Sequence, residues 1–174
     1  LNGAGAFLLI APAAVAADVS RQLIEQGGGT ITPETWQTLR IEAGQPWIGA
    51  ELSENYNPLE AGLSQFISWT KGCYIGQEVI ARLDTYDKVQ RHLMGVIVDG
   101  IESVPEAIEV HDPVESKKIG IITSLTESPM FGKKIALAYL RTQHAIPGYQ
   151  VELRPAGESG KIGAGTLAKL PFTL

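Results

Sequence analysis

The stretch WTKGCYIGQEVIARL, residues 69–83, contains the side chains of this protein that are best suited to covalent chemistry. Cys73 is the only cysteine, Lys71 stands two positions before it, and Gly72 and Gly76 flank it. A free thiol has a pKa of about 8.5, so little of it is thiolate at neutral pH unless positive charge lies close by. Lys71 and the N-terminus of a helix starting near Gly76 would both supply that charge. Together these features describe an electropositive, reachable sulfur, which is one of two interpretations of Cys73.

The competing interpretation of Cys73 is structural. A lone cysteine is among the residues most often buried as a small hydrophobic side chain. None of the three histidines shows metal-ligand spacing, and no Cys-His-Asn protease pattern is present, so the sequence predicts no metal site and no papain-like site. Glu78 and Arg82 are four residues apart and could simply pair on one face of a helix.

The segments on either side of Cys73 are predicted to be a strand and a helix. Residues 64–70 alternate in a strand-like manner, and residues 77–83 predict a short helix. Near the start, residues 7–10 predict a buried strand rather than a secretory signal, because no basic segment precedes them. The apolar run there is also shorter than the roughly 20 residues that span a bilayer.

Two further helices are predicted upstream of the cysteine. Apolar residues at four-residue spacing predict a helix over 13–26, which the glycines at 27–29 end. Because these glycines follow a helix and no Lys-Ser/Thr pair comes after them, they do not indicate a phosphate-binding loop. Thr32 and Pro33 are typical of a helix start, and that helix would end at Gly44. From the pattern alone, its one arginine is a solvated charge.

From about residue 92 the pattern changes to short apolar runs separated by turn residues. These runs cover residues 92–98, 119–125, 134–141, 149–153 and 163–172. Close spacing without a long helical pattern is typical of a small antiparallel barrel or sandwich. We therefore expect an α+β protein with a domain boundary at residues 90–92.

Composition limits the function classes. The chain has 174 residues with 44% hydrophobic and 19% charged residues, as in an ordinary soluble, folded protein. With 14 Lys+Arg against 19 Asp+Glu its net charge is −5, so nucleic acid is not an expected partner, and no membrane segment is evident. A single cysteine excludes an internal disulfide, which fits a reducing, cytoplasmic location.

The string KGCYIGQEVIARL, residues 71–83, resembles the signature of the YgfZ family of folate-binding proteins. Upstream, residues 39–52 and 57–63 resemble segments that YgfZ shares with the glycine cleavage T-protein, an aminomethyltransferase. Downstream, residues 89–96, 118–140 and 168–172 are similar to the C-terminal barrel of the same superfamily. The motifs occur in the family's order over nearly the whole chain.

The resemblance implies a fold and a place within it. Residues 1–91 would be the C-terminal part of the α/β folate-binding domain, and residues 92–174 the C-terminal antiparallel β-barrel. Because the family's proteins are longer and the chain begins with Leu1, we expect this to be the C-terminal portion of a longer protein. Tetrahydrofolate would bind in an opening between domains.

The resemblance also implies a function, namely tetrahydrofolate binding that supports iron–sulfur cluster assembly or repair through the motif cysteine. Cys73 would be the reactive thiol and Lys71 its electrostatic partner. Folate contacts or loop shaping would come from Arg40, Glu60, Tyr74, Gln77, Glu78 and Arg82. The partners implied are folate and iron–sulfur client proteins. T-proteins lack the Lys-Gly-Cys motif, so Cys73 favours the YgfZ branch.

Two alternatives stay open at this point. The chain could be an aminomethyltransferase that transfers a one-carbon unit to tetrahydrofolate, or a module that binds folate without catalysis. The family's N-terminal region, with the aspartate that T-proteins use in catalysis, is not in this sequence. Residues 2–7, NGAGAF, also offer no carboxylate where T-proteins have a Gly-Glu-x-Gly loop. Whether the chain is an enzyme is therefore left open.

Overall fold

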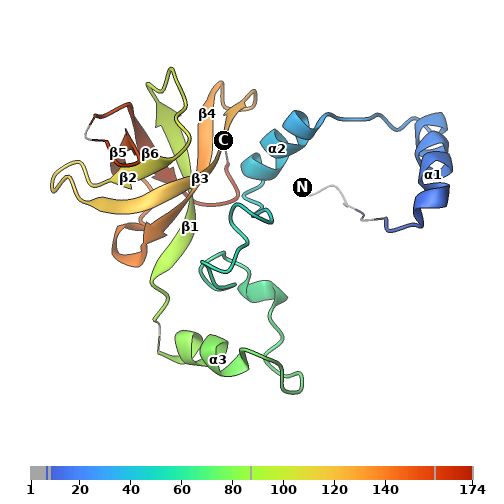
Figure 1. Ribbon diagram of the computed structural model, residues 1–174, viewed down its shortest axis with the longest axis horizontal. Coiled ribbons are helices and arrows are strands. Elements are labelled where there is room, and N and C mark those ends of the chain that lie inside the picture. Colours follow the sequence, from blue (N-terminus) through green and yellow to red (C-terminus); the bar gives the residue numbers. More distant parts are fainter. Residues whose placement is uncertain (1–6, 8, 87, 159, 174) are drawn as a thin grey trace.

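The computed structural model describes residues 7, 9–86, 88–158 and 160–173, and its centre is a closed six-stranded antiparallel barrel (Figure 1). The strands follow one another around the barrel in the order β1, β4, β3, β2, β5 and β6, and β6 pairs with β1 to close it. Their bounds are β1 Arg91–Asp99, β2 Ile108–His111, β3 Lys118–Ser128, β4 Lys133–Arg141, β5 Gln150–Pro155 and β6 Gly163–Ala168. An α+β protein with a C-terminal antiparallel barrel is therefore confirmed.

Strand β4 shows why the barrel forms here. Successive side chains of a strand point to opposite faces, so one set of β4 residues faces the barrel interior and the other faces outward. Ala136, Ala138 and Leu140 pack in the barrel core, whereas Ile135 and Leu137 form a second apolar cluster on the outer face. All five are fully buried, which explains why the sequence reads as a continuous apolar run rather than an alternating one.

Helix α2, Pro33–Glu42, covers part of that outer face (Figure 1). It begins as the sequence predicts, because the Thr32 hydroxyl accepts a hydrogen bond from the backbone N–H of Thr35. Ile41, near the end of the helix, is 1% exposed and packs in the outer cluster with Leu137 and Phe172. Two more helices, α1 Ala13–Glu25 and α3 Gln77–Thr85, confirm the other helices expected from the sequence.

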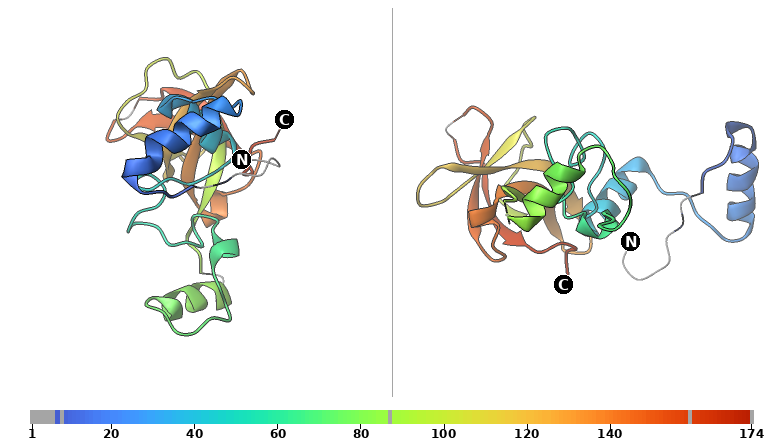
Figure 2. Two further views of the ribbon diagram at one scale, coloured as in Figure 1. Left: turned by 90° about the vertical axis from the view of Figure 1, so that its right-hand side faces the viewer. Right: turned by 90° about the horizontal axis from the view of Figure 1, so that it is seen from below.

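Helices α1 and α3 both lie away from the barrel (Figures 1 and 2). No residue of α1 is buried, and α3 buries only Ile80. Within the described part of the chain, no helix has the length and apolar character needed to cross a membrane. The barrel and α2 therefore make up the packed body from which the other two helices project.

Two predicted strands are wrong. The segment around residues 7–10 forms no strand where it is described, and Phe7 and Ile10 are 97% and 85% exposed; Leu8 lies outside the described residues. Residues 64–70 form a short 3₁₀ turn at Ser64–Phe66 and then irregular chain. Both segments have strand-like composition, but neither pairs with a strand in the described part of the chain, and pairing rather than composition decides a strand.

Strand β2 was not predicted from the sequence, and the last strand is shorter than predicted. β2 has only four residues, too few to show an alternating pattern, yet it pairs with both β3 and β5 and thereby completes the barrel. The last apolar run was predicted to be one strand over 163–172, but β6 ends at Ala168. Beyond it, Phe172 turns back onto the outer face and its N–H donates to the Glu42 carbonyl.

Candidate functional site

Cys73 lies on a projecting segment, residues 64–86, which we call the cysteine arm (Figure 1). The thiol is exposed, so the interpretation of this cysteine as a small buried residue is wrong. Gly76 caps helix α3 with a φ of 90°, a left-handed conformation that favours glycine. The motif thus folds into a turn directly ahead of a helix N-terminus, as its spacing predicts.

The other motif side chains surround the turn without closing it. The Lys71 ammonium lies over the ring of Tyr74, 4.5 Å from its centroid, which is a cation–π arrangement. Glu78 and Arg82 are exposed on α3 and form no ion pair with each other among the described residues. Gln77 is half-buried at the start of the helix. The arm therefore presents an accessible sulfur. Lys71, two residues before it in sequence, is held by the ring of Tyr74.

Apolar side chains are unusually exposed along the cysteine arm. The large hydrophobic residues that stand out into solvent there are Phe66, Trp69, Ile75, Val79 and Tyr86. Large exposed apolar residues gathered on one segment are typical of an interaction surface. Two of these residues precede Cys73 in sequence and three follow it.

Arg40 is far from being the solvated charge that its helical position suggests, because it is only 3% exposed. Its guanidinium donates to Gln37 in its own helix, to the carboxylate of Glu51 at 3.2 Å and to the Ser124 hydroxyl of β3 at 2.6 Å. Arg40 therefore joins α2 and the following loop to the barrel through a buried ion pair.

Glu51, the partner of Arg40, is completely buried and fully hydrogen-bonded. Its carboxylate also accepts from the hydroxyls of Thr123 and Ser124, both at 2.6 Å. Its backbone carbonyl accepts from the Tyr139 hydroxyl at 2.9 Å, and burial raises the pKa of that phenol well above its usual value. The guanidinium and the two hydroxyls thus satisfy the hydrogen-bonding capacity of this buried carboxylate.

Glu60 is also largely buried and stands beside the barrel end. Its carboxylate accepts from the Asn57 backbone N–H, and one oxygen lies 3.9 Å from Arg91 Nε. Arg91 in turn lies over the ring of Tyr56, 5.4 Å from its centroid. Glu60 is therefore part of the structure that holds Arg91.

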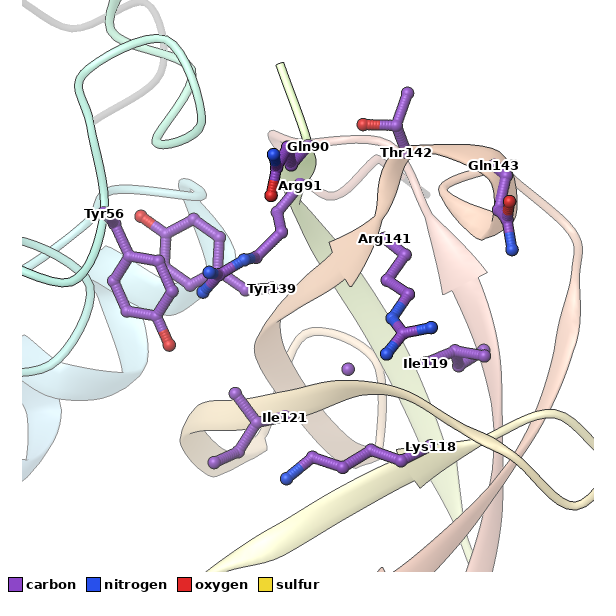
Figure 3. A pocket seen from close by; sticks show the side chains of 11 residues that line it. Tyr56, Gln90, Arg91, Lys118, Ile119, Ile121, Tyr139, Arg141, Thr142 and Gln143 are labelled. Carbon is purple, nitrogen blue, oxygen red and sulfur yellow. The ribbon is translucent and has the colours of Figure 1, made fainter. Parts of the chain in front are cut away.

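A cleft of about 860 Å³ opens at this end of the barrel (Figure 3). Its lining comes from the loop after Glu51 and from the ends of β1, β3 and β4. The residues that line it are Tyr56, Gln90, Arg91, Lys118, Ile119, Gly120, Ile121, Tyr139, Arg141, Thr142 and Gln143. Tyr56 and Tyr139 stack face to face, with ring centroids 3.6 Å apart, and close one side. Its volume is in the usual range for small-molecule sites.

The structure brings the predicted site residues into three separate places. The cysteine arm contains Lys71, Cys73 and their motif neighbours. Arg40 is buried against the outer face of the barrel, and Glu60 lies next to Arg91 of the cleft. Residues 2–6 of the glycine-rich N-terminal segment lie outside the described residues. Sequence reasoning missed the cleft cations, since Arg91, Lys118 and Arg141 are far apart in sequence and only the strand register brings them together.

A second polar cluster surrounds Asp112, just after β2. The carboxylate accepts hydrogen bonds from the Tyr149 hydroxyl and from the backbone N–H groups of Val114 and Glu115, and His144 Nδ1 is 3.8 Å away. The Tyr149 hydrogen bond is the largest cause that lowers the pKa of Asp112 below its usual value. The cluster fixes the turn between β2 and β3.

This cluster predicts a pH dependence of stability. Since the pKa of Asp112 is lower in the folded than in the unfolded protein, its ionised form stabilises the fold above the unfolded pKa of about 3.9, and this is lost as the pH falls through the folded pKa. We expect Asp112→Asn to be less stable than wild type at pH 7, with a difference that narrows below about pH 4. Urea unfolding from pH 3 to 7 measures this, and a difference of constant size would contradict it.

Among the described residues, no group of three or more His, Cys, Asp or Glu side chains is arranged to hold a metal ion. The groups that could take part in chemistry or binding are the exposed thiol of Cys73 and the cations that line the cleft.

Known proteins match both the barrel and most of the rest of the chain. Residues 91–173 match the family of the glycine cleavage T-protein C-terminal barrel domain. A protein of Arabidopsis thaliana, named provisionally as a chloroplastic transferase, is 34% identical over 172 residues, which cover 99% of this chain and 37% of that protein. The aminomethyltransferase of Listeria welshimeri is 34% identical over 175 residues, covering 98% of this chain and 46% of the enzyme.

A solved structure agrees with these matches at the level of the fold. The crystal structure of the glycine cleavage system aminomethyltransferase T from Bartonella henselae superposes with a TM-score of 0.75 at 22% identity, over 93% of this chain and 45% of that one. The chain thus spans less than half the length of these relatives. It is related to the glycine cleavage T-protein and the aminomethyltransferases, and its residues 91–173 form the C-terminal barrel domain of that family.

Proposed function

We propose that the complete protein binds tetrahydrofolate, and that residues 1–91 are the C-terminal part of its folate-binding domain. Support comes from the similarity to aminomethyltransferases, which extends over 98% of the chain and so includes α1, α2 and the cysteine arm as well as the barrel. The exposed apolar side chains of α1 and of the arm fit surfaces that pack against further protein.

The observation that carries a more specific function is the exposed Cys73 in a glycine-flanked turn ahead of α3. We propose that the protein is YgfZ-like and that this thiol supports iron–sulfur cluster assembly or repair in client enzymes in the cytoplasm. The exposed arm around the sulfur suits contact with a client protein. Lys71 would be the electrostatic partner of the sulfur, and Tyr74 would hold Lys71 in place.

The remaining predicted residues take indirect roles in this proposal. Gln77, Glu78 and Arg82 would shape the start of α3 and meet either folate or a client. Arg40 and Glu60 are both buried and hydrogen-bonded. They would affect folate binding only indirectly, by holding neighbouring parts of the structure in place.

Thiol chemistry can be tested on this chain directly. We expect Cys73 to react completely with a disulfide reagent in the native protein, without denaturant, and faster than glutathione. Lys71→Gln should slow the reaction about two- to fivefold at low salt, and the effect should shrink in 1 M NaCl. The control is Lys161→Gln, which removes a lysine from the barrel. A rate no faster than glutathione would instead favour a passive folate-binding module.

The cellular role requires the complete protein. In a cell that lacks the native gene product, wild type should restore iron–sulfur enzyme activities and Cys73→Ser should not. Wild-type activities with the Cys73→Ser variant would exclude the thiol role. Calorimetry with tetrahydrofolate tests the broader proposal separately, because Cys73→Ser is expected to bind folate normally.

A second candidate is an aminomethyltransferase, which the relatives named above favour. It predicts that the complete protein forms methylenetetrahydrofolate from a lipoyl-bound aminomethyl group. That activity should survive Cys73→Ser, because T-proteins lack the Lys-Gly-Cys motif. The same variant therefore separates the two functions.

A further inference from the structure

The cleft at the barrel end is positively charged in a chain that is negative overall. Three of its eleven lining residues, Arg91, Lys118 and Arg141, are cations, and none is a carboxylate. The whole chain by contrast has 19 Asp+Glu against 14 Lys+Arg. Cations gathered in a cleft, without acids among them, attract anionic ligands and raise their local concentration.

Two of these cations stand directly opposite each other. Arg91 and Arg141 are cross-strand partners in the β1–β4 ladder, so their side chains leave the same face of the barrel. Like charges at directly opposite positions destabilise a sheet. A bound anion would offset the repulsion between the two arginines.

The three cations differ in how they are held. Lys118 contacts Glu109 at 2.7 Å, and Glu60 stands 3.9 Å from Arg91, so each has a carboxylate beside it. Arg141 has no carboxylate partner among the residues that the structure describes, and its guanidinium points into the hollow (Figure 3). Arg141 is therefore the group best placed to bind an anion directly.

Apolar and aromatic side chains form part of the cleft wall. Ile119 is 1% exposed, and the stacked pair Tyr56 and Tyr139 closes one side. The three cations are themselves open to solvent, since the side chains of Arg91 and Lys118 are 43% and 50% exposed and Arg141 is exposed, so a ligand can reach them. The fork of a guanidinium also matches the two oxygens of a carboxylate or phosphate.

We propose that this cleft is a binding site for a small anion that carries at least two acidic groups, with Arg141 as the principal ligand and Arg91 and Lys118 as supporting cations. The site is built by the barrel and the loop containing Tyr56, and it uses neither Cys73 nor any residue of the cysteine arm. It therefore stands apart from the proposed thiol function. Two sources share the required chemistry, namely a polycarboxylate and a polyphosphate.

Calorimetry of this chain at low salt tests the site, with tricarballylate as the carboxylate probe and tripolyphosphate as the phosphate probe. We expect at least one probe to bind with a stoichiometry of one and an affinity that falls as salt rises. Arg141→Gln should reduce that affinity about tenfold or more. The probe that binds more tightly identifies the source of the ligand.

A matched control keeps the test decisive. Lys133→Gln removes one positive charge elsewhere on β4, where Lys133 pairs with Asp99, and should leave the affinity unchanged. Arg141→Gln should keep or slightly raise the melting temperature of the free protein, since it removes the repulsion with Arg91. Absence of binding by both probes, or an equal loss in the two variants, would overturn the site.

Discussion

Replacing Arg40 with methionine should lower the free energy of unfolding by about 3–5 kcal/mol, because it leaves the Glu51 carboxylate buried without its charge partner. Glu51 is 0% exposed, and its nearest cation is this guanidinium at 3.2 Å. The hydroxyls of Thr123 and Ser124 still donate to it, but they carry no charge to balance it. The loss should also weaken the attachment of α2 to β3.

Chemical denaturation of the single and double variants isolates this effect. Arg40→Met combined with Glu51→Leu removes both charges, and we expect the double variant to recover a large part of the stability that Arg40→Met loses. Arg21→Met is the matched control, since Arg21 forms ion pairs on the exposed surface of α1 and should contribute almost nothing.

The same variants decide how Arg40 relates to folate. If Arg40 touched the ligand directly and had no structural role, Arg40→Met would unfold like wild type and lose only folate affinity in the complete protein. The buried network predicts instead that Arg40→Met loses stability, and that any loss of folate affinity is a consequence of this. Affinity would then fall through displacement of the loop that leads from Glu51 to Tyr56.

The limits of sequence reasoning are clear at Arg40 itself. Thr32 and Pro33 correctly predicted the start of α2 and its cap. The sequence could not show that Glu51 and Ser124, 11 and 84 residues away, lie against Arg40. From sequence alone, a charged residue on a helix is expected to be exposed, because its partners in the folded protein are not known.

The barrel was largely predictable because its long strands combine apolar runs with turn residues. Its shortest strand, β2, was missed, and residues 64–70 were mistaken for a strand, for the same reason: strand formation depends on pairing with distant segments. The cysteine turn was predicted well, because glycines at 72 and 76 and the helix that follows are local signals. The cleft had no local signal, since register alone places Arg91 opposite Arg141.

Ile41→Ala should lower the free energy of unfolding by about 2–5 kcal/mol, because Ile41 is the apolar side chain through which α2 meets the outer cluster of the barrel. It is 1% exposed and packs with Ile135, Leu137 and Phe172. Ile135 and Leu137 belong to β4 and cannot move into the space without disturbing the barrel wall.

The neighbours of Ile41 in sequence make this site sensitive beyond the loss of apolar contact. Arg40 and Glu42, on either side, are both buried and both hydrogen-bonded to β3, through Ser124 and Ser128. A cavity at Ile41 would loosen these bonds too, so Ile41→Ala and Leu137→Ala should be less than additive in a double-mutant cycle. Ile31→Ala, at a residue that is 56% exposed just before α2, is the control and should change stability little. Equal losses for Ile41→Ala and Ile31→Ala in urea unfolding would mean that α2 is not held to the barrel in solution.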